Sequence, residues 1–431
     1  MTRVLILGSG FAGLNAAKVL AGVKGVETII IDQKNYHLFQ PLLYQVASAA
    51  LSPAEIAVPI RNIFSKYNNI KAIQGKVHKI NAETKSVLTN VGEFRYDYLI
   101  MACGARHFYF GNEEWEENAP GLKTIEQAIE IRRRILTAFE NAETENDTHK
   151  KIKLLTFVIV GGGSTGVELA GALAELTRFT FAEDFRNIDP KRTRIILIEA
   201  GPRILPNFSE KLSLRANRHL ENLGVQVLTS RKVTKIDADG VNMGDKRIEA
   251  ATVLWAAGIQ ASSLNRQLKG ELDSMGRIVV EPDMSLKHLP EIFVAGDQAH
   301  FSHQTGEPLH GIAPVALQQG RFIAKNILKE LEHKPRERFH YIDKGQLATI
   351  GRNNAVLEIG RIKLGGFWAW IIWLFVHIYY LIGFKNKFMV LLQWAYSYLT
   401  YQKGARLIVN HDWRFYKNDR LNKKGSSPDK L

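Results

Sequence analysis

The chain contains a single cysteine, Cys103, among its 431 residues. One thiol forms no internal disulfide, no CxxC redox pair and no cysteine-built metal site, and no metal is expected. Enzymes that pass electrons through a pair of cysteines, such as disulfide reductases, are therefore excluded. Any electron transfer by this chain has to run from a bound cofactor directly to an external acceptor.

Acidic residues are also scarce. The chain has 57 Lys and Arg against 43 Asp and Glu, which gives a formal net charge of +14. Such a balance is typical of proteins that meet nucleic acid, an anionic membrane surface or anionic ligands. Asp and Glu are absent from Leu364 to Thr400, and His377 is the ionisable group of the first apolar run there. Because intramembrane proton relays need ionisable groups, we expect no proton pumping.

The chain does have two glycine-rich loops, each directly after an apolar run. Gly8-Ser9-Gly10-Phe11-Ala12-Gly13 follows Val4 to Leu7, and Gly161-Gly162-Gly163-Ser164-Thr165-Gly166 follows Phe157 to Val160. Such glycines allow a tight turn and let the backbone approach a pyrophosphate, which the next helix N-terminus attracts. One loop is a weak signal, but two predict two bound dinucleotides. A flavin facing a nicotinamide, and hence electron transfer, is the natural pairing.

The first loop opens a predicted strand–helix–strand unit. A strand from Arg3 to Leu7 and a helix from Ala12 to Leu20 lead to a strand from Thr28 to Ile31, which ends at Asp32. An acidic side chain there accepts hydrogen bonds from ribose hydroxyls; a carboxylate in a surface turn is the alternative. The segment from Tyr36 to Tyr44 is interpreted as a packed loop, with a wrap around the first nucleotide as the alternative.

The second loop opens a matching unit. It follows a polar stretch from Asn141 to Lys153, which is predicted to be a solvated linker. The strand from Arg194 to Ile198 ends at Glu199, and the charged insertion before it, from Phe179 to Lys191, is predicted to be a surface loop. Because Glu199 would repel a 2′-phosphate, the pattern favours NADH over NADPH. The nearby Arg203 leaves NADPH open.

Three further apolar runs end in small residues, which lets backbone and ligand approach closely. They cover Tyr98 to Ala105, Thr252 to Ile259 and Ile292 to Asp297. The third ends in Gly-Asp, and Asp297 can accept a hydrogen bond from a polyol chain. A turn aspartate is the alternative.

On these motifs, the chain resembles the two-dinucleotide-binding flavoproteins, and in particular the type II, non-proton-pumping NADH:quinone oxidoreductases. The likeness covers nearly the whole chain. It also rests on Gly161 to Gly171 and on Ala313-Pro314-Val315-Ala316-Leu317-Gln318-Gln319-Gly320. It implies an α/β fold with two Rossmann-like dinucleotide-binding domains, for FAD and NADH, and a C-terminal helical membrane-anchoring segment.

The resemblance also assigns cofactor positions. FAD is expected at Gly8, Ser9, Gly10, Phe11, Ala12, Gly13, Asp32, Gln33, His37, Val77 and Asp297, with Ala313 and Pro314 beside the isoalloxazine ring. NADH is expected at Gly161, Gly163, Ser164, Thr165, Gly166, Glu199 and Gly258.

Two catalytic positions are implied as well: Glu168 near the nicotinamide and Gln318 at the quinone. For Glu168, a carboxylate that is simply favoured by the helix dipole is the alternative. Many relatives carry Gln at Pro314, and a proline offers neither a backbone N–H nor a polar side chain there. Cys103 stands where related flavoproteins often have Thr. His310 is either a proton donor to the reduced quinone or an ordinary loop histidine.

We therefore expect four segments. Residues 1–112 form the first part of the FAD-binding domain, 113–285 the NADH-binding domain, 286–363 the second FAD part, and 364–431 apolar helices with a basic tail. Tryptophans and tyrosines occur along the first apolar run, as in interfacial helices. The favoured interpretation is two helices lying in one leaflet. One transmembrane helix at 364–384, a re-entrant hairpin and a buried dimer interface are the alternatives.

The expected activity follows. NADH reduces FAD, and the flavin passes two electrons to a quinone of the respiratory chain, without charge translocation. Partners are the quinone and a lipid surface, a homodimer is open, and nucleic acid is not expected. No signal peptide precedes Arg3, so the cytoplasmic side of the cell inner membrane is predicted. The alternative is another FAD/NAD(P)H reductase, ferredoxin-type or apoptosis-inducing-factor-like, without quinone use; sulfide:quinone chemistry needs catalytic cysteines.

Overall fold

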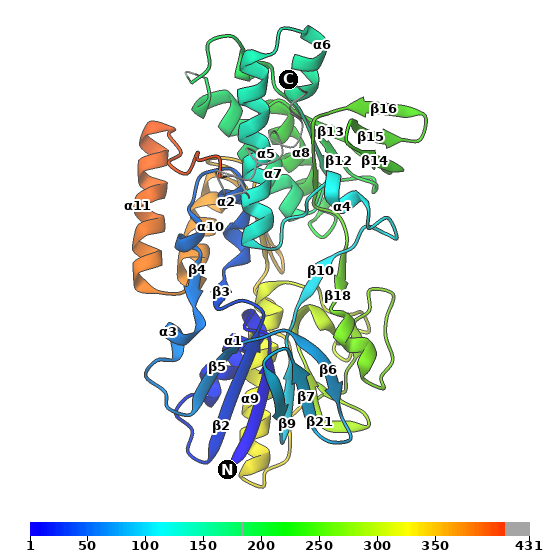
Figure 1. Cartoon of the computed structure of the whole chain (residues 1–431), viewed down its shortest axis with the longest axis vertical. Helices are drawn as coiled ribbons and strands as arrows, with labels where there is room; N and C mark the ends of the chain where they lie inside the picture. Colours follow the sequence, from blue (N-terminus) through cyan, green and yellow to red (C-terminus); the bar gives the residue numbers. More distant parts are fainter. Residues whose placement is uncertain (183, 410–431) are drawn as a thin grey trace, which may run out of the picture.

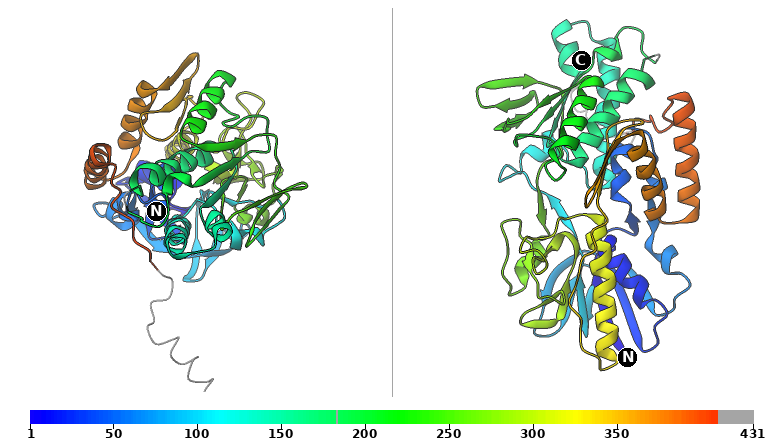
Figure 2. Two further views of the ribbon diagram at one scale, coloured as in Figure 1. Left: turned by 90° about the horizontal axis from the view of Figure 1, so that it is seen from above. Right: turned by 180° about the vertical axis from the view of Figure 1, so that it is seen from behind.

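The computed structural model describes residues 1–182 and 184–409. One α/β unit lies at each end of the long axis of the molecule, and the C-terminal helices lie against one side (Figures 1 and 2). The predicted basic tail lies outside the described residues from 410 onward.

The first α/β unit is built on a six-stranded sheet of order β20-β21-β9-β1-β2-β5. Its central strands pair in parallel and are buried, as expected for a sheet with both faces covered. The strands are β1 (Thr2–Leu7), β2 (Val26–Asp32), β5 (Ile70–Gln74), β9 (Tyr98–Met101), β20 (Ser285–Leu286) and β21 (Leu289–Val294). In sequence, β1, β2, β5 and β9 come before the second α/β unit and β20 and β21 come after it, yet all six form one sheet.

Two helices cross closely in this unit. α1 (Phe11–Leu20) packs along α9 (Ala313–Leu331), and the views in Figures 1 and 2 agree on their contact. A methyl group placed on Gly320 would lie 2.0 Å from the carbonyl oxygen of Ala12. The absence of a side chain at Gly320 therefore brings the N-terminus of α9 up to the first glycine loop.

The second α/β unit has a four-stranded parallel sheet of order β13-β12-β11-β17. Its strands are β11 (Thr156–Val160), β12 (Arg194–Ile198), β13 (Val225–Leu228) and β17 (Thr252–Trp255). Its main helices are α5 (Ile125–Thr144), α7 (Ser164–Glu175) and α8 (Glu210–Asn222). An antiparallel flap follows β13: β14 (Lys235–Asp237), β15 (Gly240–Met243) and β16 (Lys246–Glu249).

The predicted solvated linker from Asn141 to Lys153 is wrong in its structure. α5 continues to Thr144, and α6 (Thr148–Leu154) follows after a short break. Asp147 caps α6, because its carboxylate accepts from the backbone N–H groups of His149 and Lys150 at 2.8 and 3.0 Å. The polar composition reflects solvent-facing helix ends and not an unstructured connection.

The segment Tyr36 to Tyr44 begins with β3 (Tyr36–Leu38), which pairs with β4 (Ala57–Pro59), and leads into α2 (Leu43–Ala47). α2 is buried along its whole length and lies between α5, α7 and the C-terminal helices. The short helix α3 (Ile60–Phe64) follows β4. This segment thus connects the first α/β unit to the region between the second unit and the C-terminal helices.

The C-terminal unit starts with a three-stranded antiparallel sheet, β23 (Gln346–Thr349), β24 (Ala355–Ile359) and β25 (Ile362–Gly366). α10 (Phe367–Tyr380) and α11 (Phe384–Thr400) follow, joined by a turn at Leu381–Gly383. The proposed boundary at residue 364 therefore falls inside β25.

The alternative of one transmembrane helix at 364–384 is wrong for the described residues. α10 has 14 residues. The first residues of the predicted helix belong to β25, and its last residues belong to the turn that follows α10. At 1.5 Å per residue such a helix is shorter than the roughly 30 Å of a bilayer's hydrocarbon core. Within residues 1–182 and 184–409, no helix combines the length and apolar character of a membrane span.

Candidate active site

The two glycine loops have the same backbone geometry. Gly8 and Gly161 have positive φ angles of 97° and 111°, which favour glycine. A methyl group on Gly13 would lie 1.9 Å from the carbonyl oxygen of Gly8, and one on Gly166 would lie 1.9 Å from that of Gly161. Both loops therefore need glycine at the first and last positions so that the helix can start tightly against the strand.

The helix after each loop begins with unfilled donors. α1 has Gly10 and α7 has Gly163 at the N-cap, and neither receives a hydrogen bond from a capping side chain. A methyl group on either glycine would meet nothing within 4 Å, so space is open in front of both helices. A pyrophosphate fits this arrangement, since it accepts from free N–H groups and benefits from the helix dipole.

An acidic residue supports each loop from the end of the second strand. The Asp32 carboxylate accepts from the Ser9 backbone N–H at 2.6 Å and from the Ser9 hydroxyl at 2.7 Å. The Glu199 carboxylate accepts from the backbone N–H of Gly162 at 2.6 Å and of Gly201 at 2.6 Å. The two acids hold equivalent places, beside the site where a ribose would lie.

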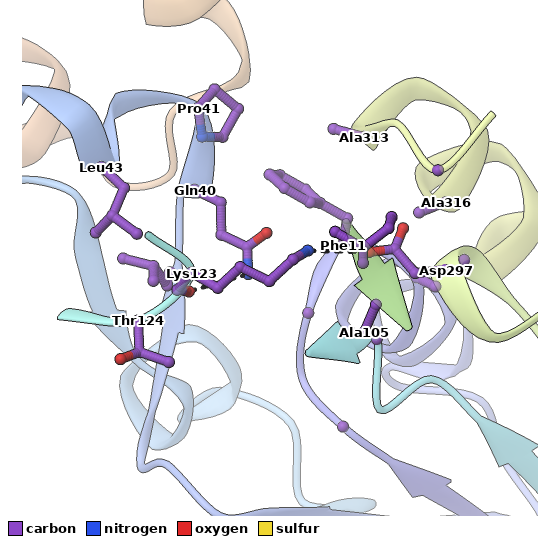
Figure 3. A pocket seen from close by; sticks show the side chains of 18 of the residues that line it. Phe11, Gln40, Pro41, Leu43, Ala105, Lys123, Thr124, Asp297, Ala313 and Ala316 are labelled. Atoms are coloured by element: carbon purple, nitrogen blue, oxygen red, sulfur yellow. Dashed lines mark hydrogen bonds and ion pairs between the residues drawn. The ribbon is translucent and has the colours of Figure 1, made fainter. Parts of the chain in front are cut away.

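The first cavity, of about 510 Å³, lies between the two α/β units and reaches the first glycine loop. Figure 3 shows Gln40, Pro41 and Leu43 on one side of it and Ala313 and Ala316 on the other. Thr165, Glu168 and Gly258 add lining from the second unit. A volume of this size suits an organic cofactor.

Many of the expected FAD positions line this cavity. They are Gly8, Ser9, Gly10, Phe11, Ala12, Asp32, Asp297 and Ala313. Of the expected NADH positions, Thr165 and Gly258 do so. The remaining NADH positions belong to the second loop and its strand end: Gly161, Gly163, Ser164, Gly166 and Glu199.

Five expected FAD positions do not line the cavity: Gly13, Gln33, His37, Val77 and Pro314. Gly13 shapes the loop, as described. The buried His37 ring contacts the Ser9 carbonyl oxygen through Nδ1 at 2.8 Å, and burial lowers the pKa of His37 to about 4. His37 is thus a neutral donor that supports the loop from behind.

Lys123 is a cavity residue that the sequence did not indicate. Its ammonium lies 3.5 Å from the Asp297 carboxylate, and Figure 3 shows its side chain crossing the pocket. Asp297 sits at the end of β21, on a turn whose backbone Gly296 donates to the Gln319 amide oxygen at 2.7 Å. A cation and a polyol acceptor thus face each other within the pocket.

Cys103 lines the same cavity, but its thiol is held in the protonated, unreactive form. Burial raises the pKa of its thiol to about 12, and its Sγ lies 3.5 Å from the Leu7 carbonyl oxygen. A thiol that stays protonated is a poor nucleophile. This placement agrees with an electron route that uses no cysteine.

Glu168 has the most shifted carboxyl of the site. Burial raises its pKa to about 8, and the 3.5 Å contact from the Thr349 backbone N–H offsets this only partly. At neutral pH this side chain is mostly protonated and can give up a proton. The helix-dipole alternative does not explain a carboxyl held in its neutral form.

A second cavity, of about 460 Å³, lies between α2 and α7 on one side and α10 and α11 on the other. Its wall is rich in aromatic side chains: Phe179, Trp370, Trp373, Trp394, Tyr398 and Tyr401. Among the described residues, Tyr44 and Glu168 are the two that line both cavities. The two spaces therefore meet at these side chains.

A buried charge cluster lies at the far wall of the second cavity. The Glu175 carboxylate accepts from the Arg352 backbone N–H, and the Lys403 ammonium donates to the Ala172 carbonyl oxygen at 3.3 Å. Burial raises the pKa of Glu175 and lowers that of Lys403 to about 8. The Arg352 guanidinium stacks 4.4 Å from the Tyr398 ring centroid and ties β23–β24 to α11.

Gln318 has hydrogen-bond partners within the protein, and its implied role at the quinone stays a prediction. Its amide donates to the Ile342 carbonyl oxygen at 2.9 Å and accepts from the Ile342 N–H at 3.0 Å. Gln318 lines neither large cavity, and neither does His310, which borders a small one of about 30 Å³. Gln318 therefore links α9 to the backbone of Ile342, and the role of His310 stays open.

Comparison with known proteins agrees with this geometry. A family model described as pyridine nucleotide-disulphide oxidoreductase matches residues 2–320, and one described as NDH2 C-terminal domain matches residues 344–401. The chain is 43% identical over 424 residues to the type II NADH:quinone oxidoreductase Ndh of Mycobacterium tuberculosis, covering 95% of this chain and 90% of that protein. It is 30% identical over 364 residues to the Staphylococcus aureus type II enzyme, at 82% and 89% coverage.

Solved structures share the fold. NDH2 from Plasmodium falciparum in complex with NADH has a TM-score of 0.85 at 21% identity, covering 95% of this chain and 100% of that one. The sulfide:quinone oxidoreductase of Aquifex aeolicus has a TM-score of 0.71 at 19% identity, with 90% and 92% coverage.

Fold and site together define an oxidoreductase of the pyridine nucleotide-disulphide class with two dinucleotide-binding units. Within that class, the chain belongs to the family of type II NADH:quinone oxidoreductases. It is an FAD-dependent enzyme that oxidises NADH and reduces a quinone. The sequence-based prediction of activity and cofactors is confirmed, and the alternative reductase without quinone use is not favoured.

Proposed function

We propose that the two cavities divide the reaction between them. The flavin and the nicotinamide occupy the first cavity, and the quinone ring enters the second. The observation that carries this proposal is the meeting of the two cavities at Tyr44 and Glu168. An apolar, aromatic wall suits a lipid-soluble ring, and a protonated carboxyl at the junction suits its reduction.

The chain's own residues fit FAD in the first cavity. The open end of α1 takes the pyrophosphate, Asp32 the adenosine ribose, and Asp297 with Lys123 the polyol chain and the ring edge. When bound, the flavin accepts a hydride from NADH and passes two electrons on. Ala313 and Ala316 line this pocket with small apolar side chains and would lie beside the flavin ring.

NADH is held by the second loop, with Glu199 beside the ribose. A 2′-phosphate would meet that carboxylate, which supports NADH over NADPH. Arg203 does not offset this, because its guanidinium donates to the carbonyl oxygens of Phe208 at 2.5 Å and Pro206 at 2.8 Å. Thr165 and Glu168 then lie where the nicotinamide meets the flavin.

The finer localisation is part of the proposal: peripheral attachment to the cytoplasmic side of the cell inner membrane. On α10, Ala369, Trp373 and His377 face the protein, while Phe375 and Tyr379 are 73% and 74% exposed. Phe384 and Leu399 on α11 are 86% and 80% exposed. Such an aromatic surface is typical of helices that lie in one leaflet.

Positive charge lies beside this apolar surface. Lys385 is exposed, and the Lys387 ammonium donates to the Tyr379 carbonyl oxygen at 2.9 Å. Basic groups near anionic lipid add attraction of about 1 kcal/mol each. A homodimer interface is the competing use of the same exposed face. A re-entrant hairpin is not part of the proposal, because helices of this length can lie in one leaflet.

The domain division stays as proposed from the sequence, with one refinement. Residues 1–112 and the stretch from 286 to the start of β23 form the FAD-binding unit, and 113–285 the NADH-binding unit. The C-terminal unit is better begun at β23, because β23, β24 and β25 form one sheet on which α10 packs.

The test uses detergent-purified protein with its visible spectrum. NADH is expected to bleach the flavin absorbance near roughly 450 nm, and a short-chain quinone to restore it. NADPH is expected to bleach it much more slowly. A preparation that holds flavin and is bleached by NADH, yet is not reoxidised by any quinone, would refute the quinone step.

A further inference from the structure

The junction of the two cavities contains a tyrosine whose hydroxyl oxygen already accepts a hydrogen bond from its neighbour. Tyr44 comes from α2 and is buried. The Gln45 amide nitrogen donates to the Tyr44 hydroxyl oxygen at 2.9 Å. The Trp394 indole N–H on α11 donates to the Gln45 amide oxygen at 2.7 Å. Three side chains from two elements thus form a single chain of hydrogen bonds.

The direction of this chain follows from its first member. An indole nitrogen only donates, so the Gln45 oxygen has to face Trp394 and its NH₂ group has to face Tyr44. The Tyr44 oxygen therefore accepts, and its own hydrogen points elsewhere. Within the part of the chain that the structure describes, that hydrogen has no acceptor. Because Tyr44 and Glu168 line both cavities, this hydrogen is available to a ligand at the junction.

A quinone bound there needs a donor for its carbonyl oxygen. The motif residues of the family supply none in this chain, because Pro314 has no donor and the Gln318 amide is occupied by Ile342. A polar ligand group in an apolar cavity that finds no partner loses affinity. The open hydroxyl at the junction meets that need.

We propose that the Tyr44 hydroxyl donates a hydrogen bond to a carbonyl oxygen of the quinone, in the direction set by Trp394 and Gln45. This rests on the proposed function, in which the quinone occupies the second cavity. Tyr44 is then a catalytic residue, and Gln45 and Trp394 are positioning residues.

The reaction balances without a proton from Tyr44. The quinone takes up two electrons and two protons to become the quinol. NADH brings the electron pair with one proton as a hydride, and solvent supplies the other proton. Glu168 gives its carboxyl proton to the quinone oxygen and is reprotonated from solvent. Burial holds the pKa of Tyr44 well above its usual value, so the hydroxyl stays a donor while negative charge grows on the oxygen.

The test compares two electron acceptors in the flavin-containing Tyr44→Phe variant. Stopped-flow flavin reduction by NADH is expected to be unchanged. Reoxidation by a short-chain quinone is expected to slow by about a hundred- to a thousandfold, as for loss of one transition-state donor. Reoxidation by ferricyanide, which takes electrons without a proton or a hydrogen bond, is expected to keep its rate.

A matched control is Tyr96→Phe. Tyr96 is buried in the first α/β unit, and its hydroxyl has no partner among the described residues. Its loss should leave all three rates unchanged. A second variant, Trp394→Phe, keeps an aromatic ring but frees Gln45 to turn. It is expected to lower the quinone kcat several-fold while the ferricyanide rate stays constant.

Two results would overturn the role of Tyr44: equal quinone rates in wild type and Tyr44→Phe, or equal slowing with quinone and ferricyanide. Failure of the proposed function has a different signature, since wild-type protein itself would then reduce ferricyanide but no quinone. If Tyr44→Phe loses its flavin, the decision passes to Trp394→Phe, in which wild-type quinone kcat would refute the proposal.

Discussion

Gly13 and Gly166 make the two nucleotide sites separable by single substitutions. A methyl group at either position would sit 1.9 Å from a backbone carbonyl oxygen, so the helix start has to shift. Gly13→Ala is expected to yield protein with less than about a tenth of the wild-type flavin. Gly166→Ala is expected to keep its flavin but lose most NADH-driven bleaching. Flavin content and NADH titration measure both, and each variant is the control for the other; full flavin in Gly13→Ala contradicts the assignment.

Glu168 is expected to matter for rate and not for assembly. Glu168→Gln keeps the shape of the side chain but removes the proton that the neutral carboxyl supplies. Turnover with NADH and quinone should fall at least several-fold while FAD stays bound, as absorbance shows. Wild-type turnover in this variant would remove Glu168 from the mechanism.

The same carboxyl predicts a pH dependence of stability. Its folded pKa of about 8 lies above the ordinary 4.5, so between these values the folded state holds a proton that the unfolded state has lost. The contribution of the protonated Glu168 carboxyl to folding stability is complete below about pH 4.5 and is lost as pH rises through about 8. Relative to Glu168→Gln, the free energy of unfolding of the wild-type holoprotein should fall by a few kcal/mol at most as pH rises over this range. This is on the order of the pKa shift itself. Thermal midpoints from about pH 5 to 9 test this; parallel curves would contradict it.

At this scale, sequence reasoning worked where geometry is local. Asp32 and Glu199 follow their loops at a set spacing, and the strand and helix between them fix where the carboxylates point. Gln318 depends on its non-local hydrogen bonds with Ile342, and the Gln45 amide beside Tyr44 depends on Trp394, which no spacing reveals. A stronger signal was available for Tyr44, since a tyrosine beside a glutamine in an apolar segment has to satisfy both polar groups when buried.

Of the two C-terminal helices, α10 buries Ala369, Trp373 and His377 while α11 buries only Val390, so α11 is the less covered. Its Phe384 and Leu399 lie near opposite ends and are both strongly exposed. Replacing them together as Phe384→Ser and Leu399→Glu removes apolar area worth roughly 1.5–3 kcal/mol per side chain if buried in lipid. Binding to vesicles containing anionic lipid should weaken at least about tenfold in a flotation assay.

The control for this surface is Leu214→Glu, which is 51% exposed and lies on α8 and not on α10 or α11. It should bind vesicles like wild type. Turnover with a short-chain quinone should persist in the double variant, because its two side chains are not part of the junction. If vesicle binding is unchanged but the protein becomes monomeric, the face serves a dimer instead.

The elements themselves were predictable where a continuous buried apolar run marks them. β12 has the expected bounds, and α1 begins one residue before the expected start. The stretch from Asn141 to Lys153 was misjudged because its polar composition hides two helix ends. α5 still buries Ala142 near its C-terminus, and Asp147 caps the start of α6. The run at 364–384 was divided between a strand and a helix by Gly366, whose φ of 93° ends β25.

For the molecule as a whole, the two cavities predict that the two half-reactions can be blocked independently. Ala395 lies on α11, is exposed, and lines the second cavity but not the first. Ala395→Trp adds bulk at that wall without entering the packed core, so it should raise the quinone KM by about tenfold or more. NADH-driven flavin reduction should stay at the wild-type rate, because the first cavity is untouched. Met389→Trp, on the same helix but outside the cavity wall, is the matched control and should leave both rates unchanged. If Ala395→Trp instead slows flavin reduction and quinone reduction alike, the two substrates share one space and the division into two cavities fails.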